Sequence, residues 1–140
     1  MQAKELIIHC SATEEGKDFG ASDIDKWHRQ QGYNGIGYHF VVKLDGTVQS
    51  GRACNQDGAH CYGHNKYAIG VCYIGGLRKG KPADTRTDSQ KDSLVKLIRV
   101  LMHAFSIKID NVRVHNEFAD KACPCFTREQ FLQELATHTC

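Results

Sequence analysis

The sequence lacks the excess of one charge that marks proteins binding nucleic acid or anionic membranes. Its 18 Lys and Arg residues against 16 Asp and Glu give a formal net charge of +2, and the basic residues are scattered along the chain. Electrostatic attraction to a polyanion needs a basic patch or stripe, and none is visible. We therefore predict that the partner of this protein is not a nucleic acid.

Long hydrophobic runs are also absent. No stretch approaches the roughly 20 apolar residues that a membrane-spanning helix requires. The start, MQAKELIIHC, has no basic segment leading into a long apolar one, which is the pattern of a secretory signal peptide. The sequence therefore predicts no membrane span, no signal peptide and a cytoplasmic location in the producing cell.

The close-set cysteine pairs of a structural zinc finger are missing as well. The chain has 7 cysteines and 8 histidines, but no two cysteines stand in a C-x2-C pair. Cys123 and Cys125 are separated by a single residue, and the odd total favours reduced thiols over a disulfide framework. Any metal site must therefore be assembled from distant segments.

The length indicates one domain over residues 1–140, because 140 residues is close to the usual size of a compact unit. A chain of this size buries about two thirds of its unfolded surface without help from disulfides or a structural metal. A metal, if present, would therefore be there for chemistry. We find no internal repeat and no low-complexity linker.

Hydrophobic patterning predicts three stretches of β-structure. The run ELIIHC at residues 5–10 suits a buried strand, with His9 near its C-terminal end. Residues 38–48 suit a β-hairpin with a turn at Asp45 and Gly46. The run YAIGVCYIGG at 67–76 resumes as a second buried strand that stops at paired glycines.

Helix signals lie between and after these strands. Residues 22–32 suit a short amphipathic helix, with Ser22 as N-cap and Gly32 as its stop. Capping boxes, in which Gln follows Thr by three residues, open two further helices. They are Thr87 with Gln90, followed by an apolar stripe up to Phe105, and Thr127 with Gln130.

Two segments read as loops. Residues 52–66 are rich in Gly, His, Asn and Cys without periodicity, and loops of that length in a compact domain are usually functional or disordered. Residues 77–86, LRKGKPADTR, read as a polar loop. Strands alternating with helices predict an α/β or α+β sheet domain.

Three side chains could form a catalytic metal site. His9 lies at a strand end, His115 follows the apolar VRV, and Cys123 comes eight residues later. Strand ends meet at one edge of a sheet, and two imidazoles with one thiolate leave the fourth zinc position open for water. The alternative is that these are packed histidines and an apolar cysteine, and the residues alone leave both readings open.

Five sequence blocks resemble a known family. They are IIHCSAT, WHRQQGY, GYHFVVKLDGTVQSGR, GHNKYAIGVCYIGG and VHNEFADKACPCF. In this order they resemble the signature blocks of the zinc-dependent N-acetylmuramoyl-L-alanine amidases (amidase type 2, related in fold to peptidoglycan recognition proteins), most closely the T7-type bacteriophage lysozymes. The resemblance covers nearly the whole chain and implies an α/β domain with a central mixed β-sheet flanked by helices.

The resemblance implies roles for five residues. His9, His115 and Cys123 match the zinc ligands of the family, with one Zn²⁺ per chain as cofactor. Tyr38 and Lys121 match its tyrosine and lysine required for turnover, and both could stabilise the oxyanion formed from the substrate amide. That amide joins the lactyl group of N-acetylmuramic acid to L-alanine, so the implied partner is peptidoglycan.

The resemblance also places part of the 52–66 loop beside the cleft, and we expect His60, His64 and Asn65 to contact substrate. Surface polarity is the competing interpretation for all three. His39 alternates with Tyr38 along the hairpin, so the two should point to opposite faces, and we interpret His39 as structural.

Two positions depart from the wider family. Many relatives carry a glutamate, proposed as catalytic base, where this chain has Cys72, which leaves the base open although Glu117 is close in sequence. Cys125 replaces a small residue and could compete for zinc or form a disulfide on oxidation. The sequence analysis assigns no role to His28, and Cys10, Cys54, Cys61 and Cys140 read as spare thiols.

Other functions stay open at this stage. Peptidoglycan recognition proteins of this fold bind without cutting, but tend to lack the cysteine ligand that Cys123 would supply. A thiol hydrolase using Cys10 or Cys61 with a histidine is a second alternative, and a regulator that binds a protein partner is a third. The expected enzyme is a monomeric phage or prophage endolysin that acts on the cell wall after release, or a cytoplasmic enzyme recycling wall fragments.

Overall fold

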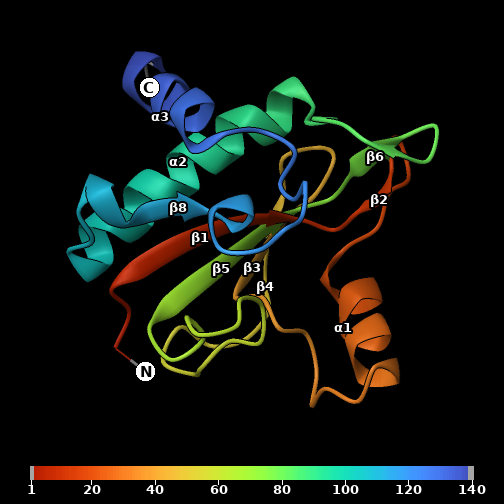
Figure 1. The fold of residues 1–140 in the computed structure, drawn as a ribbon, viewed down its shortest axis with the longest axis horizontal. Coiled ribbons are helices and arrows are strands. Elements are labelled where there is room, and N and C mark those ends of the chain that lie inside the picture. Colours follow the sequence, from red (N-terminus) through yellow and green to blue (C-terminus); the bar gives the residue numbers. More distant parts are fainter. Residues whose placement is uncertain (1, 139–140) are drawn as a thin grey trace.

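The computed structural model describes residues 2–138 and is built around a mixed β-sheet (Figure 1). Its strands lie in the order β4 (Val48–Ser50), β3 (Phe40–Val42), β5 (Ala68–Tyr73), β1 (Glu5–Cys10) and β8 (Val112–Val114). β1 runs parallel to both β5 and β8, β5 runs parallel to β3, and β4 is antiparallel to β3. The predicted fold class, a central mixed sheet flanked by helices, is confirmed.

Helices cover both faces of this sheet. Figure 1 shows α2 (Asp88–Phe105) and α3 (Arg128–Thr137) lying together on one side and α1 (Ala21–Gln30) on the other. The larger core cluster joins the sheet to α2 and α3, and includes Leu94, Ile98 and Phe131. A smaller cluster around Ile24 joins the sheet to α1.

Side-chain alternation along β1 separates core from site. Leu6, Ile8 and Cys10 belong to the cluster under α2 and α3. Successive residues of a strand point to opposite faces, so Ile7 and His9 face the other side. Ile7 packs there with the loop that precedes β5, and His9 is 1% exposed. The strand therefore places one buried histidine on the face away from the main core.

The helix starts agree with the sequence in two of three cases. The capping boxes of α2 and α3 are present as predicted, with Thr87 and Thr127 each accepting from the backbone N–H three residues on. The prediction of Ser22 as the N-cap of α1 is wrong, because the cap is Gly20. The Asp23 carboxylate accepts from the Gly20 N–H, and the Gln49 side chain accepts from the Ala21 N–H.

A second, three-stranded sheet was not predicted. Its strands lie in the order β2 (Thr13–Glu14), β6 (Gly76–Arg78) and β7 (Lys81–Pro82), so the segment read as a polar loop contains a small hairpin. The Glu14 carboxylate accepts from the N–H groups of Lys79 and Gly80 at the hairpin turn. Residues 52–66 form an irregular loop as predicted, and two short 3-10 turns, η1 (Ile109–Asn111) and η2 (His115–Glu117), flank β8.

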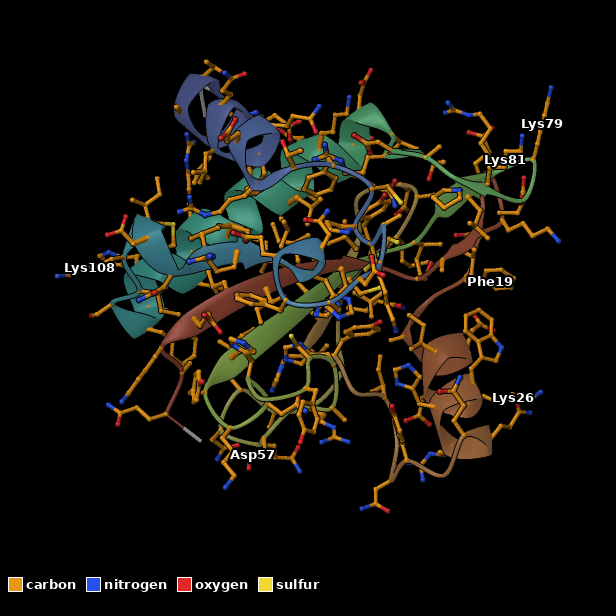
Figure 2. The ribbon with its side chains drawn as sticks, viewed as in Figure 1. Phe19, Lys26, Asp57, Lys79, Lys81 and Lys108 are labelled. Carbon is orange, nitrogen blue, oxygen red and sulfur yellow. The ribbon has the colours of Figure 1, made fainter. Side chains whose placement is uncertain are left out.

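Lysine side chains project from separate parts of the surface. In Figure 2, Lys26 projects from α1, Lys79 and Lys81 project from the β6–β7 hairpin, and Lys108 lies at the far side of the molecule. Over the described residues 2–138, no helix has both the length and the apolar character needed to cross a membrane.

Candidate metal centre and active site

Three candidate ligands come together at one edge of the main sheet. One ligand atom each from His9, His115 and Cys123 lies within 4.8 Å of the other two. β1 and β8 are parallel neighbours with Ile8 paired to Val114, so the residues that follow these two positions emerge side by side. The loop before α3 then returns the Cys123 thiol to the same point.

The free donor atoms of this cluster suit a metal ion. Nδ1 of His115 is buried and has no hydrogen-bond partner among the described residues. Nε2 of His9 lies 2.9 Å from Nδ1 of His60, which leaves Nδ1 of His9 for a ligand, and the Cys10 N–H donates to Sγ of Cys123 at 3.1 Å. Two ring nitrogens and one sulfur are ligands that Zn²⁺ accepts in proteins, so the residues present fit the ion.

Electrostatics keep both imidazoles in the form that binds metal. Burial lowers the pKa of His9 well below its ordinary value, and the charges of His60, His115 and Lys121 lower it further. Burial also lowers the pKa of His115, with a smaller contribution from Lys121. A metal ligand must be deprotonated, so these shifts favour binding near neutral pH.

The cluster opens into a cavity of about 700 Å³. His115, Tyr38 and Lys121 all line it, so the two residues expected to act in turnover face the same space as one of the three candidate ligands. Tyr38 lies against His9, with ring centroids 5.1 Å apart. Burial raises the pKa of Tyr38 well above its ordinary value, which keeps its hydroxyl protonated as a hydrogen-bond donor.

The three expected substrate contacts all have partners within the protein. His60 lines the cavity, but its ring nitrogens face His9 and the Ala68 carbonyl. Asn65 also lines it, while its Oδ1 accepts from the N–H groups of His60 and Cys61. His64 is not among the lining residues. Its Nδ1 lies 2.7 Å from Glu5, and its ring stacks on Phe118 with centroids 4.1 Å apart.

Some cavity residues had no assigned role in the sequence analysis. His28 on α1 lines the cavity, and its Nδ1 accepts from the Gly37 N–H at 2.9 Å. Tyr33 and Tyr62 also line it, with 44% and 100% of their surface exposed. No spacing signal separates His28 from an ordinary surface histidine, because its helix is amphipathic and short.

The structure gives the surroundings of the two positions that depart from the family pattern. Cys72 is fully buried beneath Tyr38, and burial raises the pKa of its thiol. The Glu117 carboxylate accepts from the Val114 N–H and pairs with Arg113. Cys125 lies outside the three-ligand group, in a left-handed conformation with φ of 74°, and its thiol contacts the Gly76 carbonyl.

Cys10, Cys61 and His39 are buried within the fold. Cys10 and Cys61 are buried, and their pKa values are raised, that of Cys10 by hydrogen bonding to Cys123 and by burial, that of Cys61 by burial and the charge of Glu5. A thiol nucleophile needs a lowered pKa, so neither fits the thiol hydrolase reading. His39 is buried, accepts from the Gly70 N–H and contacts the Gln56 carbonyl. Cys140 lies outside the described residues.

Comparison with known proteins decides the family. The family model described as N-acetylmuramoyl-L-alanine amidase matches residues 1–126. The chain is 39% identical over 135 residues to the endolysin of Escherichia phage T7, covering 94% of this chain and 88% of the relative. The chain belongs to the N-acetylmuramoyl-L-alanine amidase family. This identity agrees with the five sequence blocks that resembled the family, and the chain is an enzyme of the amidase class.

Solved structures of similar proteins share the fold of this chain. The N-acetylmuramoyl-L-alanine amidase LysC from Clostridium intestinale superposes with a TM-score of 0.82 at 28% identity, covering 99% of this chain and 88% of that one. PGRP-SA of the bumblebee superposes with a TM-score of 0.76 at 24% identity, covering 94% and 81%. The second likeness shows a shared fold alone.

Proposed function

We propose that this amidase is a zinc-dependent phage endolysin that hydrolyses the amide between N-acetylmuramic acid and L-alanine in peptidoglycan. The observation that carries the proposal is the convergence of His9, His115 and Cys123 beside a cavity that His115, Tyr38 and Lys121 line. The proposed site of action is the cell wall, reached after release from the producing cell.

His9, His115 and Cys123 would hold the ion, and His115 connects this group to the cavity that it lines. A zinc ion bound there supplies Lewis-acid polarisation of the amide carbonyl and acidifies a water molecule. The three side chains come from segments that the sheet and the α3 loop fix in place, which keeps the site assembled before substrate arrives.

Tyr38 and Lys121 act on the carbonyl oxygen of the substrate. The Tyr38 hydroxyl, kept protonated by burial, donates a hydrogen bond to the developing oxyanion. The Lys121 ammonium faces the same cavity and adds a positive charge. An amide carbonyl is a poor electrophile, so stabilisation of this charge is where the protein contributes most.

The cavity supplies no carboxylate for the role of general base. None of the described residues that line it is an aspartate or glutamate, Cys72 is buried away from it, and Glu117 is engaged by Arg113. We therefore propose that catalysis here proceeds without a carboxylate base, and that the lining offers imidazole, phenol and ammonium groups instead.

A protein that binds peptidoglycan without cutting it was the alternative left open by the sequence, and a peptidoglycan recognition protein shares this fold. The presence of Cys123 beside the two histidines favours the enzyme, because a binding surface does not require a third metal ligand. Substrate contact by His60, His64 and Asn65 stays a prediction, because each has a protein partner in the free enzyme.

Product analysis tests the proposal. Purified protein is incubated with sacculi, and the soluble products are identified by mass spectrometry. We expect stem peptides that begin with a free L-alanine, lost on treatment with a strong chelator and restored by zinc. Release of new reducing sugar ends without free L-alanine would place the cut in the glycan and overturn the assignment.

Two cysteine variants serve as a matched pair. Cys123→Ala removes a proposed ligand and should abolish peptide release. Cys125→Ala changes a neighbouring thiol of the same loop that lies outside the three-ligand group, and should leave release intact. Full activity of Cys123→Ala after removal of contaminating metal would argue against the zinc site.

A further inference from the structure

His60 makes two polar contacts that together form a short relay. Its Nδ1 lies 2.9 Å from Nε2 of His9, and its Nε2 lies 2.9 Å from the carbonyl oxygen of Ala68, the first residue of β5. The two imidazoles stand edge to face, with centroids 4.9 Å apart. The relay therefore runs from His9, a candidate metal ligand, through the ring of His60 to the backbone of Ala68 in the central sheet.

The hydrogen positions in this relay follow from its end point. A carbonyl oxygen only accepts, so Nε2 of His60 must carry a proton. A second proton on Nδ1 would make His60 a cation that faces no carboxylate among residues 2–138, and burying an unpaired charge is costly. His60 Nδ1 is therefore the acceptor, Nε2 of His9 is the donor, and Nδ1 of His9 carries a lone pair.

Two glycines leave a narrow space that the His60 ring fills. A Cβ added to Gly58 would lie 2.4 Å from Cδ2 of His60, and one added to Gly70 would lie 2.6 Å from the same ring. Both glycines are needed to leave room for the imidazole. The backbone N–H of His60 is held at 2.8 Å by the Asn65 side chain, which fixes the loop on the other side of the ring.

The surrounding groups exclude other partners for the ring. His39 packs edge to face against His60 with centroids 5.8 Å apart, and its own nitrogens are taken by the Gly70 N–H and the Gln56 carbonyl. Tyr38 lies on the cavity side, 6.3 Å away between centroids. The lone pair on Nδ1 of His60 therefore points toward His9.

We propose that His60 is a positioning residue of the metal centre, which holds His9 in the tautomer and ring orientation that present Nδ1 to the ion. The inference rests on the proposed zinc site and assigns His60 a role different from substrate contact. Ligating histidines usually pass their second N–H to a carboxylate, a carbonyl or water. Here the His60 imidazole accepts the second N–H of His9, and His60 is held in turn by the Ala68 carbonyl of the sheet.

The test combines three variants with metal-binding measurements on the purified protein. His60→Leu fills the space without an acceptor, whereas His60→Asn can place its amide oxygen near the position of Nδ1. His64→Gln perturbs the same loop without touching His9 and is the matched control. Zinc affinity is measured by competition with a chromophoric chelator, and thermal unfolding confirms that each variant is folded.

We expect His60→Leu to bind zinc 10- to 100-fold more weakly, the range seen when such outer partners are removed. His60→Asn should recover most of this loss, and His64→Gln should bind like the wild type. Cobalt substituted for zinc should give an altered absorption spectrum in His60→Leu only. Equal zinc affinity of His60→Leu and the wild type would overturn the proposal.

Nitrogen NMR of the metal-free protein separates this inference from the zinc proposal itself. Two-bond couplings report which ring nitrogen of His9 carries the proton, and we expect Nε2 in the wild type and a mixture in His60→Leu. A proton on Nδ1 of His9 in the wild type would overturn the relay. A wild type that binds no zinc would instead refute the proposed function, while the tautomer measurement would still decide the role of His60.

Discussion

Tyr38 shows how burial prepares a single side chain for catalysis. Its ring is packed between His9 and His28, with centroid distances of 5.1 Å and 5.5 Å, and its hydroxyl lies close to the buried thiol of Cys72. Burial raises its pKa, so the proton stays on the oxygen across the whole working range of pH. The same packing holds the ring in one orientation.

We predict that Tyr38→Phe lowers kcat about 10²- to 10³-fold with little change in KM, because the lost donor acts on the oxyanion. The variant keeps the ring and should keep zinc affinity and thermal stability. Initial rates on a soluble muramyl peptide, with bound metal measured in parallel, check this. A variant that turns over at the wild-type rate would remove Tyr38 from the proposed mechanism.

Tyr62 is the opposite case, an aromatic ring with no protein contact to protect it. It lines the cavity from the 52–66 loop and is 100% exposed. Rings with one apolar face and a polar tip are favoured where a ligand will cover them. Its position at the rim suggests contact with the substrate outside the reacting amide.

We predict that Tyr62→Ala raises KM about fivefold, the effect of losing roughly 1 kcal/mol of stacking, and leaves kcat and the melting temperature unchanged. Tyr67→Ala is the matched control, since Tyr67 directly follows the same loop and lies outside the cavity lining. Steady-state kinetics on both variants decide the matter. Equal KM values for Tyr62→Ala and the wild type would contradict a substrate contact.

Site residues that stand in family-like blocks were predictable from the sequence, and those that only packing brings to the site were not. His9, His115 and Cys123 stand in quotable motifs, and the structure brings them together. Tyr62 stands in no motif, and His28 lies in the block WHRQQGY, but nothing in their spacing reveals the cavity. The contact between His60 and His9 joins residues 51 positions apart through one ring nitrogen each, which no periodicity can show.

At the scale of elements, the two capping boxes look identical in sequence but differ in burial. Gln90 at the start of α2 is fully buried, and its side-chain amide donates to the carbonyls of Val42 on β3 and Ile74, the residue after β5. Gln130 at the start of α3 is exposed and serves its own helix only. Gln90 therefore joins helix and sheet as well as capping α2.

We predict that Gln90→Leu destabilises the protein by about 2–3 kcal/mol, because the Ile74 carbonyl and the Thr87 N–H lose buried partners. Gln130→Leu, the matched change in the exposed box, should cost no more than about 1 kcal/mol. Urea unfolding of both variants measures the difference. Equal losses would mean that capping alone accounts for the effect of Gln90.

Long periodic elements were predictable and short paired ones were not. α2 and β5 carry strong apolar patterns, so their positions followed from the sequence. The second sheet is made of two- and three-residue strands whose pairing joins Thr13 to Gly76, and its polar hairpin resembles a loop in any local window. The start of α1 was misplaced because Gly20 caps it with help from Gln49, a distant residue.

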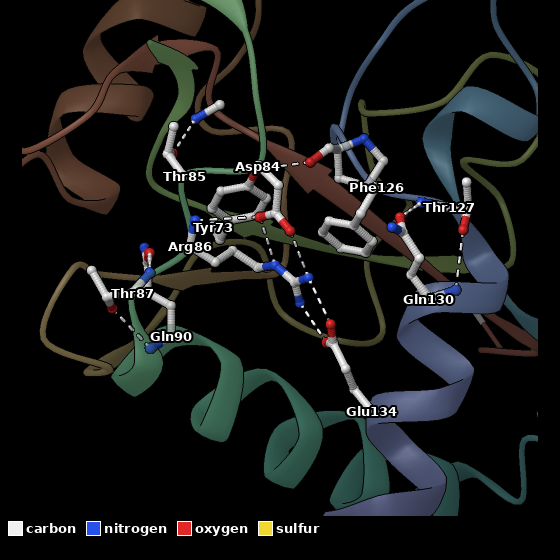
Figure 3. A network of polar contacts seen from close by, with 12 residues as sticks. Tyr73, Asp84, Thr85, Arg86, Thr87, Gln90, Phe126, Thr127, Gln130 and Glu134 are labelled. Carbon is white, nitrogen blue, oxygen red and sulfur yellow. Dashed lines mark hydrogen bonds and ion pairs between the residues drawn. The ribbon is translucent and has the colours of Figure 1, made fainter.

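At the scale of the whole molecule, a buried arginine connects the last helix to the rest (Figure 3). The Arg86 side chain is 1% exposed and pairs with both Asp84 and Glu134 of α3, with N–O distances from 2.7 to 3.0 Å. Its guanidinium lies 3.8 Å from the centre of the Phe126 ring, at the end of the loop that carries Cys123. The sequence predicts a polar loop at Arg86, because no neighbouring residue in the sequence indicates that this charged side chain is buried.

This network makes a prediction about stability and pH. Burial alone would raise the pKa of Asp84, but hydrogen bonds and the charge of Arg86 hold it below its usual value. A carboxyl whose pKa is lower in the folded than in the unfolded state stabilises the fold above the unfolded value, near 4. That contribution is lost as the pH falls through the folded value, so it is present at neutral pH and disappears in acid.

We predict that Arg86→Met costs about 3 kcal/mol at pH 7, because it leaves two carboxylates facing each other without their cation. The estimate is at the low end of that range, since Asp84 and Glu134 each keep 31% of their side-chain surface in water. Below pH 4 the wild type loses the ion pairs, and in the variant protonation removes the repulsion between the two carboxylates. The difference in the free energy of unfolding between wild type and variant should therefore become smaller. Urea unfolding at pH 7, 4 and 3 measures this gap, with Arg78→Met, which breaks an exposed pair with Glu15, as a control expected to change little. A gap that stayed constant across this range would show that Arg86 stabilises the molecule through its packing on Phe126 and not through its charge.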